Sequence, residues 1–306
     1  MDLLCIVLAL MLDLWLKEPR RFHPLVGFGN MAIKLEQRLN GPRHPWLKGT
    51  LATLLLTLPL PLTMFWLPML PPWLAVMVQA VILYLTIGYQ SLRQHAQAIT
   101  TPLSQGDLPR AREAVSRIVS RQTQQMDEQQ VATATTESIL ENGHDALFGS
   151  LFWYLLWGLP GAVLFRLVNT LDAMWGYRTP RYEMFGKTAA RLDDLMGMIP
   201  ARLTALSYLL AARPALHAAS YAHTLTQARR WKGINPGVVM AAGAQAIRVT
   251  LGGKARYHDH TVERPTLGDG AKASTATIDQ ALALLQRALW LWLLAIALST
   301  LLQKLA

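Results

Sequence analysis

Two apolar stretches of the chain, residues 51–70 and 73–91, are each long enough to cross a membrane. A transmembrane helix needs about 20 mainly apolar residues to span the hydrocarbon core of a bilayer. Between the two stretches lies an uncharged segment with Pro68, Pro71 and Pro72, and proline interrupts a helix because it lacks a backbone N–H. The pattern predicts a helical hairpin with a very short outer loop.

Three further apolar runs flank this hairpin at a distance. Residues 2–16 and 198–212 are short for a full crossing, and the first of them carries Asp13 near its end. Residues 288–302 form a better anchor, because tryptophans stand at one end of the run, as they do at membrane interfaces. We therefore expect partial insertion of the two short runs and a full crossing of the last.

The run at residues 147–168 is interrupted by Gly158, Pro160 and Gly161. A broken helix is tolerated at membrane depth where the freed backbone lines a protein cavity. The sequence therefore leaves two alternatives open, a simple crossing and a re-entrant hairpin.

The alternation of apolar and polar segments predicts an all-α, polytopic membrane protein with broken or re-entrant helices and cytoplasmic helical loops. The composition agrees, since 52% of the 306 residues are hydrophobic and 16% are charged, against about 25% charged residues in an average soluble protein. The sequence contains no internal repeat, low-complexity tract or Gly/Ser linker. We therefore expect residues 1–306 to form a single integral-membrane domain.

The net charge of +10 comes from 29 Lys and Arg against 19 Asp and Glu, and many of the basic residues fall in the segments 169–197 and 213–287. Basic loops stay on the cytoplasmic side of a membrane, so we place both segments in the cytoplasm of an inner-membrane protein. Segment 169–197 can lie there only if one or both neighbouring apolar runs turn back. Because no helix-turn-helix, zinc-finger or RNP pattern is present, topology explains the charge better than nucleic-acid binding does.

Several chemistries are excluded by what the sequence lacks. A single cysteine, Cys5, rules out an intramolecular disulfide and a cysteine-based metal cluster. The phosphate-loop and dinucleotide-binding glycine motifs are both missing, so the standard nucleotide-binding folds are excluded.

Acidic residues recur every four positions just before the broken apolar run, at Glu137, Glu141 and Asp145, with Asn142 beside them. On a helix this spacing puts the carboxylates on one face, where they repel one another. The row is either a solvated helix face or a site whose cation is Mg²⁺ or an arginine from another segment.

A second polar cluster follows the broken run and a third lies near the N-terminus. Arginines and carboxylates so close to a bilayer are either structural ion pairs or a site that recognises phosphate and carboxylate groups. The second cluster contains Asn169, Asp172, Tyr177, Arg178, Arg191, Asp193, Asp194 and Arg202. The third contains Asp13, Arg20 and His23.

At these same clusters the chain resembles the CobD/CbiB family of cobalamin biosynthesis, the membrane-bound adenosylcobinamide-phosphate synthases, nearly from end to end. The most specific match runs from Asn169-Thr-Leu-Asp172 through Gly176-Tyr177-Arg178 and Ala190-Arg191-Leu-Asp193-Asp194 to Ile199-Pro200-Ala-Arg202. Supporting matches are Leu12-Asp13, Pro19-Arg20, His23-Pro24, Glu141-Asn142, Gly158-Leu-Pro160-Gly161, Leu251-Gly-Gly253, Glu263-Arg264-Pro265 and Gly268-Asp269-Gly270.

The resemblance implies an amide-forming ligase that joins the propionate carboxyl of adenosylcobyric acid to the amine of aminopropanol phosphate, with ATP as co-substrate and Mg²⁺. It implies contact with membrane lipid and with later enzymes of the cobalamin pathway. Catalytic roles would fall to Glu137, Glu141, Asp145 and Asp172, and the first three would also hold Mg²⁺. Substrate binding would fall to Asp13, Arg20, His23, Asn142, Asn169, Tyr177, Arg178, Arg191, Asp193, Asp194, Arg202, Asn235, Arg264 and Asp269.

Two positions depart from the family pattern. Gln122 stands where members usually show an aspartate, and the region around Asn235 and Gly237 keeps few of the usual residues. These departures leave a rival interpretation open, in which the protein is a non-catalytic AmpE-like membrane sensor or a corrinoid-binding scaffold.

Overall fold

The computed structural model of the protein describes residues 2–17, 23–212, 218–257 and 260–305. The contacts within the chain divide it into two compact units, Met1–Gln90 with Asp145–Met198 and Ser91–His144 with Ile199–Ala306. The chain passes between the units inside helices rather than through linkers, which agrees with the lack of a linker in the sequence.

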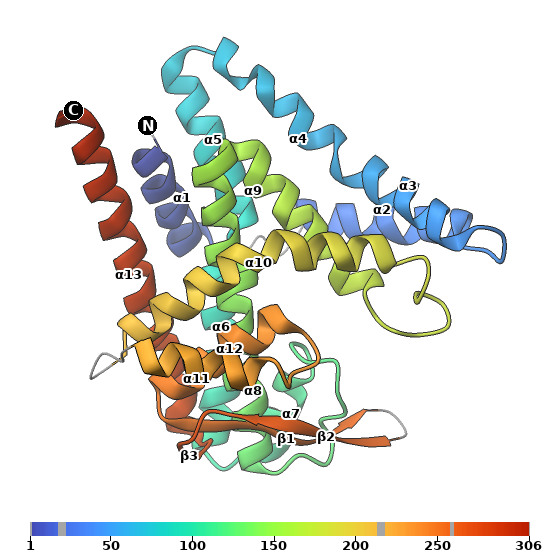
Figure 1. Ribbon diagram of the computed structural model, residues 1–306, viewed down its shortest axis with the longest axis vertical. Helices are drawn as coiled ribbons and strands as arrows, with labels where there is room; N and C mark the ends of the chain where they lie inside the picture. The colour runs from blue at the N-terminus through green and yellow to red at the C-terminus, as the bar shows by residue number, and fades with distance from the viewer. Residues whose placement is uncertain (1, 18–22, 213–217, 258–259, 306) are drawn as a thin grey trace. The chain divides into compact units, whose positions relative to one another are not determined.

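The first unit is entirely helical. Its elements are α1 (Asp2–Leu16), α2 (Pro24–Leu39), α3 (Pro45–Thr57), α4 (Pro59–Thr63), the 3₁₀ helix η1 (Met64–Met69), α5 (Pro72–Thr86), most of the π-helical turn η2 (His144–Phe148), α9 (Gly149–Trp175) and the first half of α10 (Lys187–Leu210). The helices α3, α4 and η1 follow one another up to Met69, and after Pro71 and Pro72 the chain turns back into α5, which contacts η1 (Figure 1). The predicted helical hairpin is therefore confirmed.

The broken run reverses direction within α9. Gly158 has φ 66° and ψ −159°, a backbone conformation that only glycine adopts readily. A Cβ on Gly161 would lie 2.5 Å from the carbonyl oxygen of Trp153, although residues eight apart in a straight helix are about 12 Å apart. Figure 1 shows the two limbs of α9 running in opposite directions. Of the two alternatives, the structure has the turned-back one.

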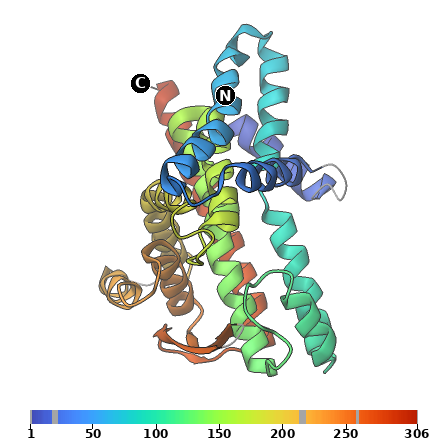
Figure 2. The ribbon, with the colours of Figure 1, turned by 90° about the vertical axis from the view of Figure 1, so that its right-hand side faces the viewer.

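The second unit combines helices with a small sheet. Its elements are α6 (Tyr89–Ser104), α7 (Leu108–Val115), α8 (Glu128–Gly143), the second half of α10, α11 (Ala218–Ala228), α12 (Ile234–Ala246), the strands β1 (Val249–Tyr257), β2 (His260–Leu267) and β3 (Ala271–Lys272), and α13 (Thr275–Leu305). The core forms around α8, in which every residue from Val131 to Leu140 is buried. Helix α12 packs on α8, with Gly243 lying against Leu140, and α13 runs beside α8 (Figure 2).

The strands form a three-stranded sheet of order β2-β1-β3, a feature that the sequence analysis did not predict. Strands β1 and β2 are an antiparallel hairpin, and β3 pairs in parallel with the start of β1. The register shifts between Leu251 and Gly253, so a bulge interrupts β1 at Gly252. Helix α12 covers the hairpin and fixes it next to α8.

Four helical stretches among the described residues are long and apolar enough to cross a membrane: Pro45–Met69, Pro72–Ser104, Glu128–Trp175 and Thr275–Leu305. Large apolar side chains on these stretches point outward, including Trp66, Trp73 and Trp290, which are 65%, 69% and 65% exposed. Exposed apolar surface of this extent suits lipid rather than water. The prediction of a mostly helical, multi-pass membrane protein with bent helices is therefore confirmed.

Candidate functional site

The centre of the candidate site is Glu137, a buried carboxylate in the middle of α8. Asp127 starts this helix with a capping box, in which its side chain accepts from the Gln130 backbone N–H and the Gln130 side chain accepts from the Asp127 backbone N–H. Three turns later, Glu137 is 4% exposed within the fully buried stretch of the helix. A charge at such a position needs partners, because desolvation of an unpaired carboxylate is very costly.

Two arginines and one backbone amide supply those partners. Arg121, from the segment that precedes α8, donates to Glu137 Oε2 at 2.5 Å, and Arg264 of β2 donates to the same oxygen at 2.8 Å. The backbone N–H of Gly252 in β1 donates to Oε1 at 2.9 Å. Both oxygens of the carboxylate are therefore engaged by the protein.

The bulge in β1 gives the amide its position. Gly252 has φ +88°, and a Cβ there would collide with the carbonyl oxygen of Pro265, so glycine is required on both counts. Arg264 also donates to the carbonyl oxygens of Gly252 at 3.0 Å and Gly253 at 3.3 Å, and its guanidinium lies 5.3 Å from the ring centre of Trp231. One ion-pair cluster thus joins the β1–β2 hairpin to helix α8.

The Arg121–Glu137–Arg264 cluster carries two positive charges and one negative charge. The side chains of the two arginines are 8% and 12% exposed, so water compensates little of the extra positive charge. A buried excess cation raises the local affinity for an anion. The geometry is therefore suited to hold a carboxylate or a phosphate group.

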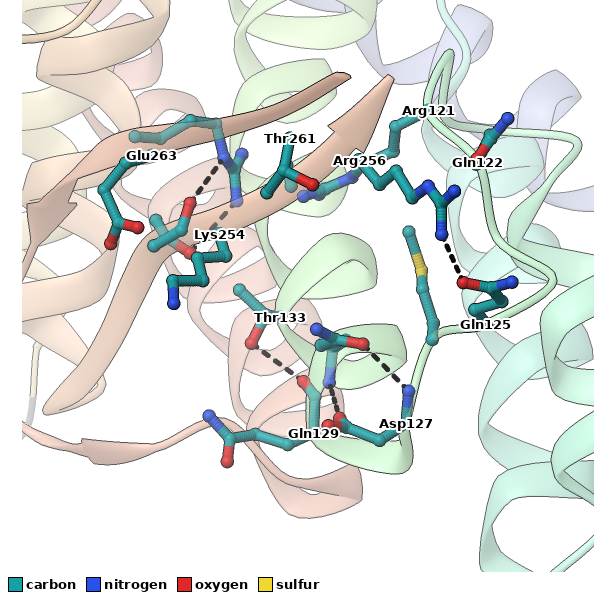
Figure 3. Close-up of a pocket in the computed structure, with 16 residues that line it drawn as sticks. Arg121, Gln122, Gln125, Asp127, Gln129, Thr133, Lys254, Arg256, Thr261 and Glu263 are labelled. Atoms are coloured by element: carbon teal, nitrogen blue, oxygen red, sulfur yellow. Dashed lines mark hydrogen bonds between the residues drawn. The ribbon is translucent and has the colours of Figure 1, made fainter. Parts of the chain in front are cut away.

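Two cavities of the second unit meet at this cluster, and Arg121 and Arg264 line both of them. The smaller has a volume of about 260 Å³ and is lined, among others, by Glu137, Ser138, Glu141, Asn142 and Trp231. The larger has a volume of about 530 Å³ and lies between the start of α8 and the β1–β2 hairpin (Figure 3). Asn142 is held in the smaller cavity by hydrogen bonds to the backbone and side-chain oxygens of Ser138.

The acidic row is only partly realised as predicted. Glu137 and Glu141 line one cavity of the second unit, whereas Asp145 lies in the π-helical turn η2 and belongs to the first unit. Within the described part of the chain, no three His, Cys, Asp or Glu side chains form a group that could hold a metal ion. The metal role of the row stays a prediction, and arginine is the cation that the structure shows beside Glu137.

In the first unit, the second limb of α9 and the start of α10 bring four of the predicted residues together. Asn169 donates to Asp193 Oδ1 at 3.2 Å, and Asp172 lies close enough to Asp194 for their charges to interact. Desolvation raises the pKa of Asp194 above its ordinary value of 3.8. Trp153, which donates from its indole N–H to the backbone oxygen of Met196 at 3.0 Å, helps to hold α10 in place.

The loop between α9 and α10 carries exposed residues and one strong anchor. Tyr177 and Arg178 of this loop are exposed, and so is Arg191 in the following helix α10. Arg181, in contrast, binds Glu36 of α2 through two parallel hydrogen bonds of 2.9 and 2.5 Å. This pairing lowers the pKa of Glu36 below its ordinary value of 4.5 and ties the loop to α2.

Two of the predicted residues near the N-terminus accept hydrogen bonds from backbone N–H groups. Asp13 is buried and accepts a hydrogen bond from the Gln90 backbone N–H at 2.8 Å, and the ring of His23 caps the start of α2 by accepting from the Leu25 N–H at 3.1 Å. Arg20 lies outside the described residues. The substrate-binding roles of these three stay predictions.

The remaining predicted residues belong to the second unit. Arg202 of α10 donates to the side-chain oxygen of Asn235 at 2.9 Å, which joins two of them directly. Asp269 is exposed and pairs with His223 of α11 at 2.7 Å, so it holds the sheet end against that helix. Neither pair lines the two cavities at Glu137.

Sequence reasoning missed three basic residues that line the cavities, Arg121, Lys254 and Arg256. Lys254 and Arg256 are two apart on β1, and this spacing puts both on one face only if the segment is a strand. A strand assignment for residues 249–257 is therefore the signal that would have found them.

Comparison with known proteins gives matches over most of the chain. A family model described as CobD/Cbib protein matches residues 6–285. The cobalamin biosynthesis protein CobD of Chromobacterium violaceum is 50% identical over 294 residues, which cover 93% of this chain and 92% of that protein. The protein of the same name from Stutzerimonas stutzeri is 48% identical over 295 residues, 96% of each chain.

A more distant relative, the probable cobalamin biosynthesis protein CobD of Pyrococcus furiosus, is 42% identical over 206 residues, or 66% of this chain and 70% of that protein. No solved structure gives a significant match. The family model spans most of the chain, and the first two relatives align over nearly their whole length. The chain therefore belongs to the CobD/CbiB family of cobalamin biosynthesis proteins.

Proposed function

We propose that the protein is an adenosylcobinamide-phosphate synthase, an ATP-dependent amide ligase that joins a propionate carboxyl of adenosylcobyric acid to the amine of aminopropanol phosphate. Family membership and the names of the relatives support the pathway. The observation that carries the reaction class is the buried Arg121–Glu137–Arg264 cluster at the junction of two cavities.

The chemistry needs anion-binding groups at two stages. A propionate oxygen attacks the γ-phosphorus of ATP, and ADP leaves with the electrons of the broken P–O bond. The amine then attacks the acyl carbon, phosphate leaves, and the nitrogen loses a proton. Negative charge gathers at the transferred phosphoryl group and at the acyl oxygen, so preorganised cations stabilise both steps.

In this proposal Arg121 and Arg264 bind the propionate and then the acyl phosphate, because they face both cavities. Glu137 acts as a positioning residue that holds the two guanidinium groups and does not itself react. Glu141, which lines the smaller cavity together with both arginines, accepts the proton of the attacking amine.

Magnesium enters the proposal as the counter-ion of ATP. The described carboxylates are not grouped as a three-ligand site, and both oxygens of Glu137 are already engaged. Magnesium in phosphoryl-transfer sites is commonly held by one or two carboxylates together with substrate phosphates.

We further propose that the protein lies in the inner membrane with these cavities on the cytoplasmic side, in contact with lipid and with later enzymes of the pathway. The concentration of basic residues in the segments 169–197 and 213–287 supports this orientation. ATP is available on that side.

Growth rescue tests the proposed function against the rival scaffold. The wild-type gene should restore growth of a synthase-deficient strain that is supplied with cobyric acid, and Glu141→Gln should not, although the membrane fraction still contains the variant protein. The matched variant Glu128→Gln, at the exposed start of α8, should rescue as well as wild type. Binding of the corrinoid by the wild-type protein without any rescue would contradict the ligase and favour a scaffold.

A further inference from the structure

The larger cavity of the second unit differs in composition from an ordinary hydrophobic ligand pocket. Its volume of about 530 Å³ falls within the roughly 300–1,000 Å³ of small-molecule sites. Its lining consists largely of basic and amide side chains (Figure 3). The basic members are Arg121, Lys254, Arg256 and Arg264, and the amide members are Gln122, Gln125, Gln129 and Gln130.

Positive charge exceeds negative charge in this lining. Four basic side chains stand against two carboxylates, Asp127 and Glu263, and Asp127 is occupied as the cap of α8 by the Gln130 backbone N–H at 2.7 Å. Glu137, just behind the wall, compensates part of the charge of Arg121 and Arg264. The cavity keeps more cations than anions even when Glu137 is included.

Lys254 and Arg256 carry the part of this charge that Glu137 does not reach. They lie on one face of β1 because successive side chains of a strand point to opposite sides. Arg256 is opposite Thr261 in the hairpin and donates to the neutral Gln125 side chain at 2.5 Å, whereas Lys254 is opposite Glu263, which compensates part of its charge. Two neighbouring cations repel each other, and an anion between them and α8 removes that repulsion.

The other groups in the wall suit the same anion. The amides of four glutamines supply N–H donors, and Met126 and Asp127, which lead into α8, line the cavity together with Gln129 of its first turn. An inorganic phosphate would occupy a small part of the volume, so a larger phosphate ester fits better.

We propose that this cavity is a phosphate-ester subsite in which Lys254 and Arg256 bind the phosphate of a substrate, while Arg121 and Arg264 connect it to the smaller cavity that contains Glu141. The assignment rests on the proposed function for the identity of the reaction, but phosphate binding itself is independent of turnover. The phosphate can come from a nucleotide or from the amino-alcohol phosphate, and the two are separated by experiment.

Equilibrium binding to the purified full-length protein tests the subsite without catalysis. The probes are a non-hydrolysable ATP analogue, aminopropanol phosphate and inorganic phosphate, each at fixed low ionic strength. The test variants are Lys254→Met and Arg256→Gln. The matched controls are Lys272→Met and Arg117→Gln, since Lys272 lies on β3 and Arg117 pairs with Glu113, both away from the cavity.

We expect each test variant to weaken binding of one phosphate ester about 10-fold, because one charge-assisted hydrogen bond is lost, and each control to leave it unchanged. The ester whose affinity falls identifies the source of the phosphate. Unchanged affinity for both esters in Lys254→Met and Arg256→Gln overturns the subsite, as does a wild-type protein that binds neither ester. Thermal unfolding of every variant shows that loss of binding is not loss of fold.

Turnover measured on the same samples separates this inference from the proposed function. Amide synthesis with unchanged ester affinity in both variants removes the subsite and keeps the ligase. Charge-dependent ester binding without any amide product keeps the subsite and removes the ligase.

Discussion

At the scale of the residue, the contacts between α8 and the β1–β2 hairpin in the second unit depend on one buried carboxylate, Glu137. From its spacing in the sequence, Glu137 could equally be part of a solvated helix face. The structure instead buries it and gives it two arginines, one 16 positions before it and one 127 positions after it. Removal of one member of such a cluster leaves an uncompensated buried charge, which makes Glu137 decisive for stability as well as for the position of the arginines.

Glu137→Gln should destabilise the protein by about 3–5 kcal/mol, because it leaves Arg121 and Arg264 buried without their carboxylate. Glu113→Gln is the matched control, since Glu113 also pairs with an arginine but their side chains are 70% and 68% exposed, and it should change stability by at most about 1 kcal/mol. Denaturant unfolding in detergent measures both. Equal effects of the two substitutions would show that the cluster is not a buried ion pair.

The Glu36–Arg181 pair predicts a specific dependence of stability on pH. Hydrogen bonds from Arg181, as the largest cause, lower the pKa of Glu36 in the folded state below its ordinary value of 4.5. As the pH falls, Glu36 is therefore protonated at a higher pH in the unfolded chain than in the folded protein. The pair stabilises the fold fully above about pH 4.5 and progressively less as the pH falls through the lowered pKa.

Unfolding midpoints of wild type and Glu36→Gln across this range check the sign. The advantage of wild type over Glu36→Gln should be constant at neutral pH and should shrink below pH 4.5. An advantage that grows on acidification would contradict the assignment. Glu183→Gln, in the same loop but exposed, serves as the control for general acid effects.

At the scale of the element, the β1–β2 hairpin is built around two adjacent glycines with different demands. Gly252 and Gly253 have φ values of +88° and +72°, but a Cβ would collide with Pro265 only at Gly252 and would meet nothing within 4 Å at Gly253. Position 252 therefore needs glycine both because a Cβ would clash and because its φ is positive. Position 253 needs glycine only because its φ is positive.

Gly253→Ala should cost about 1–2 kcal/mol, the strain of a left-handed conformation for an L-residue. Gly252→Ala should lower the free energy of unfolding by about 1–3 kcal/mol more, because overpacking adds to that strain and moves the N–H that donates to Glu137. Denaturant unfolding of the two variants compares them directly. The opposite ranking would mean that Gly252 is not pinned between Pro265 and Glu137.

The sequence predicted the elements with strong local signals and missed those that depend on distant partners. The hairpin of apolar helices and the break at Gly158 follow from runs and prolines that can be read locally. The hairpin 249–267 was missed because glycines and a proline interrupt its alternation of apolar and polar residues. Arg121 was missed because spacing along one helix does not reveal a partner from another segment.

At the scale of the whole molecule, apolar length and basic loops together describe a multi-pass membrane protein. Four helical stretches among the described residues are long enough to cross, and their exposed tryptophans and leucines suit lipid. The cytoplasmic position of the basic segments and the single integral-membrane domain stay predictions from the sequence.

Lys187, which starts α10, tests the orientation through cysteine labelling. The natural Cys5 is a buried free thiol, so it should give little background. In Lys187→Cys, a membrane-impermeant thiol reagent should label the protein after cells are opened and not before. Labelling of intact cells would place the segment 169–197 outside and contradict its proposed cytoplasmic position.

Amide synthesis by the purified full-length protein tests the central claim most directly. The protein, with ATP, Mg²⁺, adenosylcobyric acid and aminopropanol phosphate, should yield adenosylcobinamide phosphate by mass spectrometry, with one ADP formed for each amide bond. Glu141→Gln should abolish this yield while the protein remains folded. Near-full turnover in Glu141→Gln would remove that carboxylate from the mechanism, and no amide product from the folded wild-type protein would contradict the ligase itself.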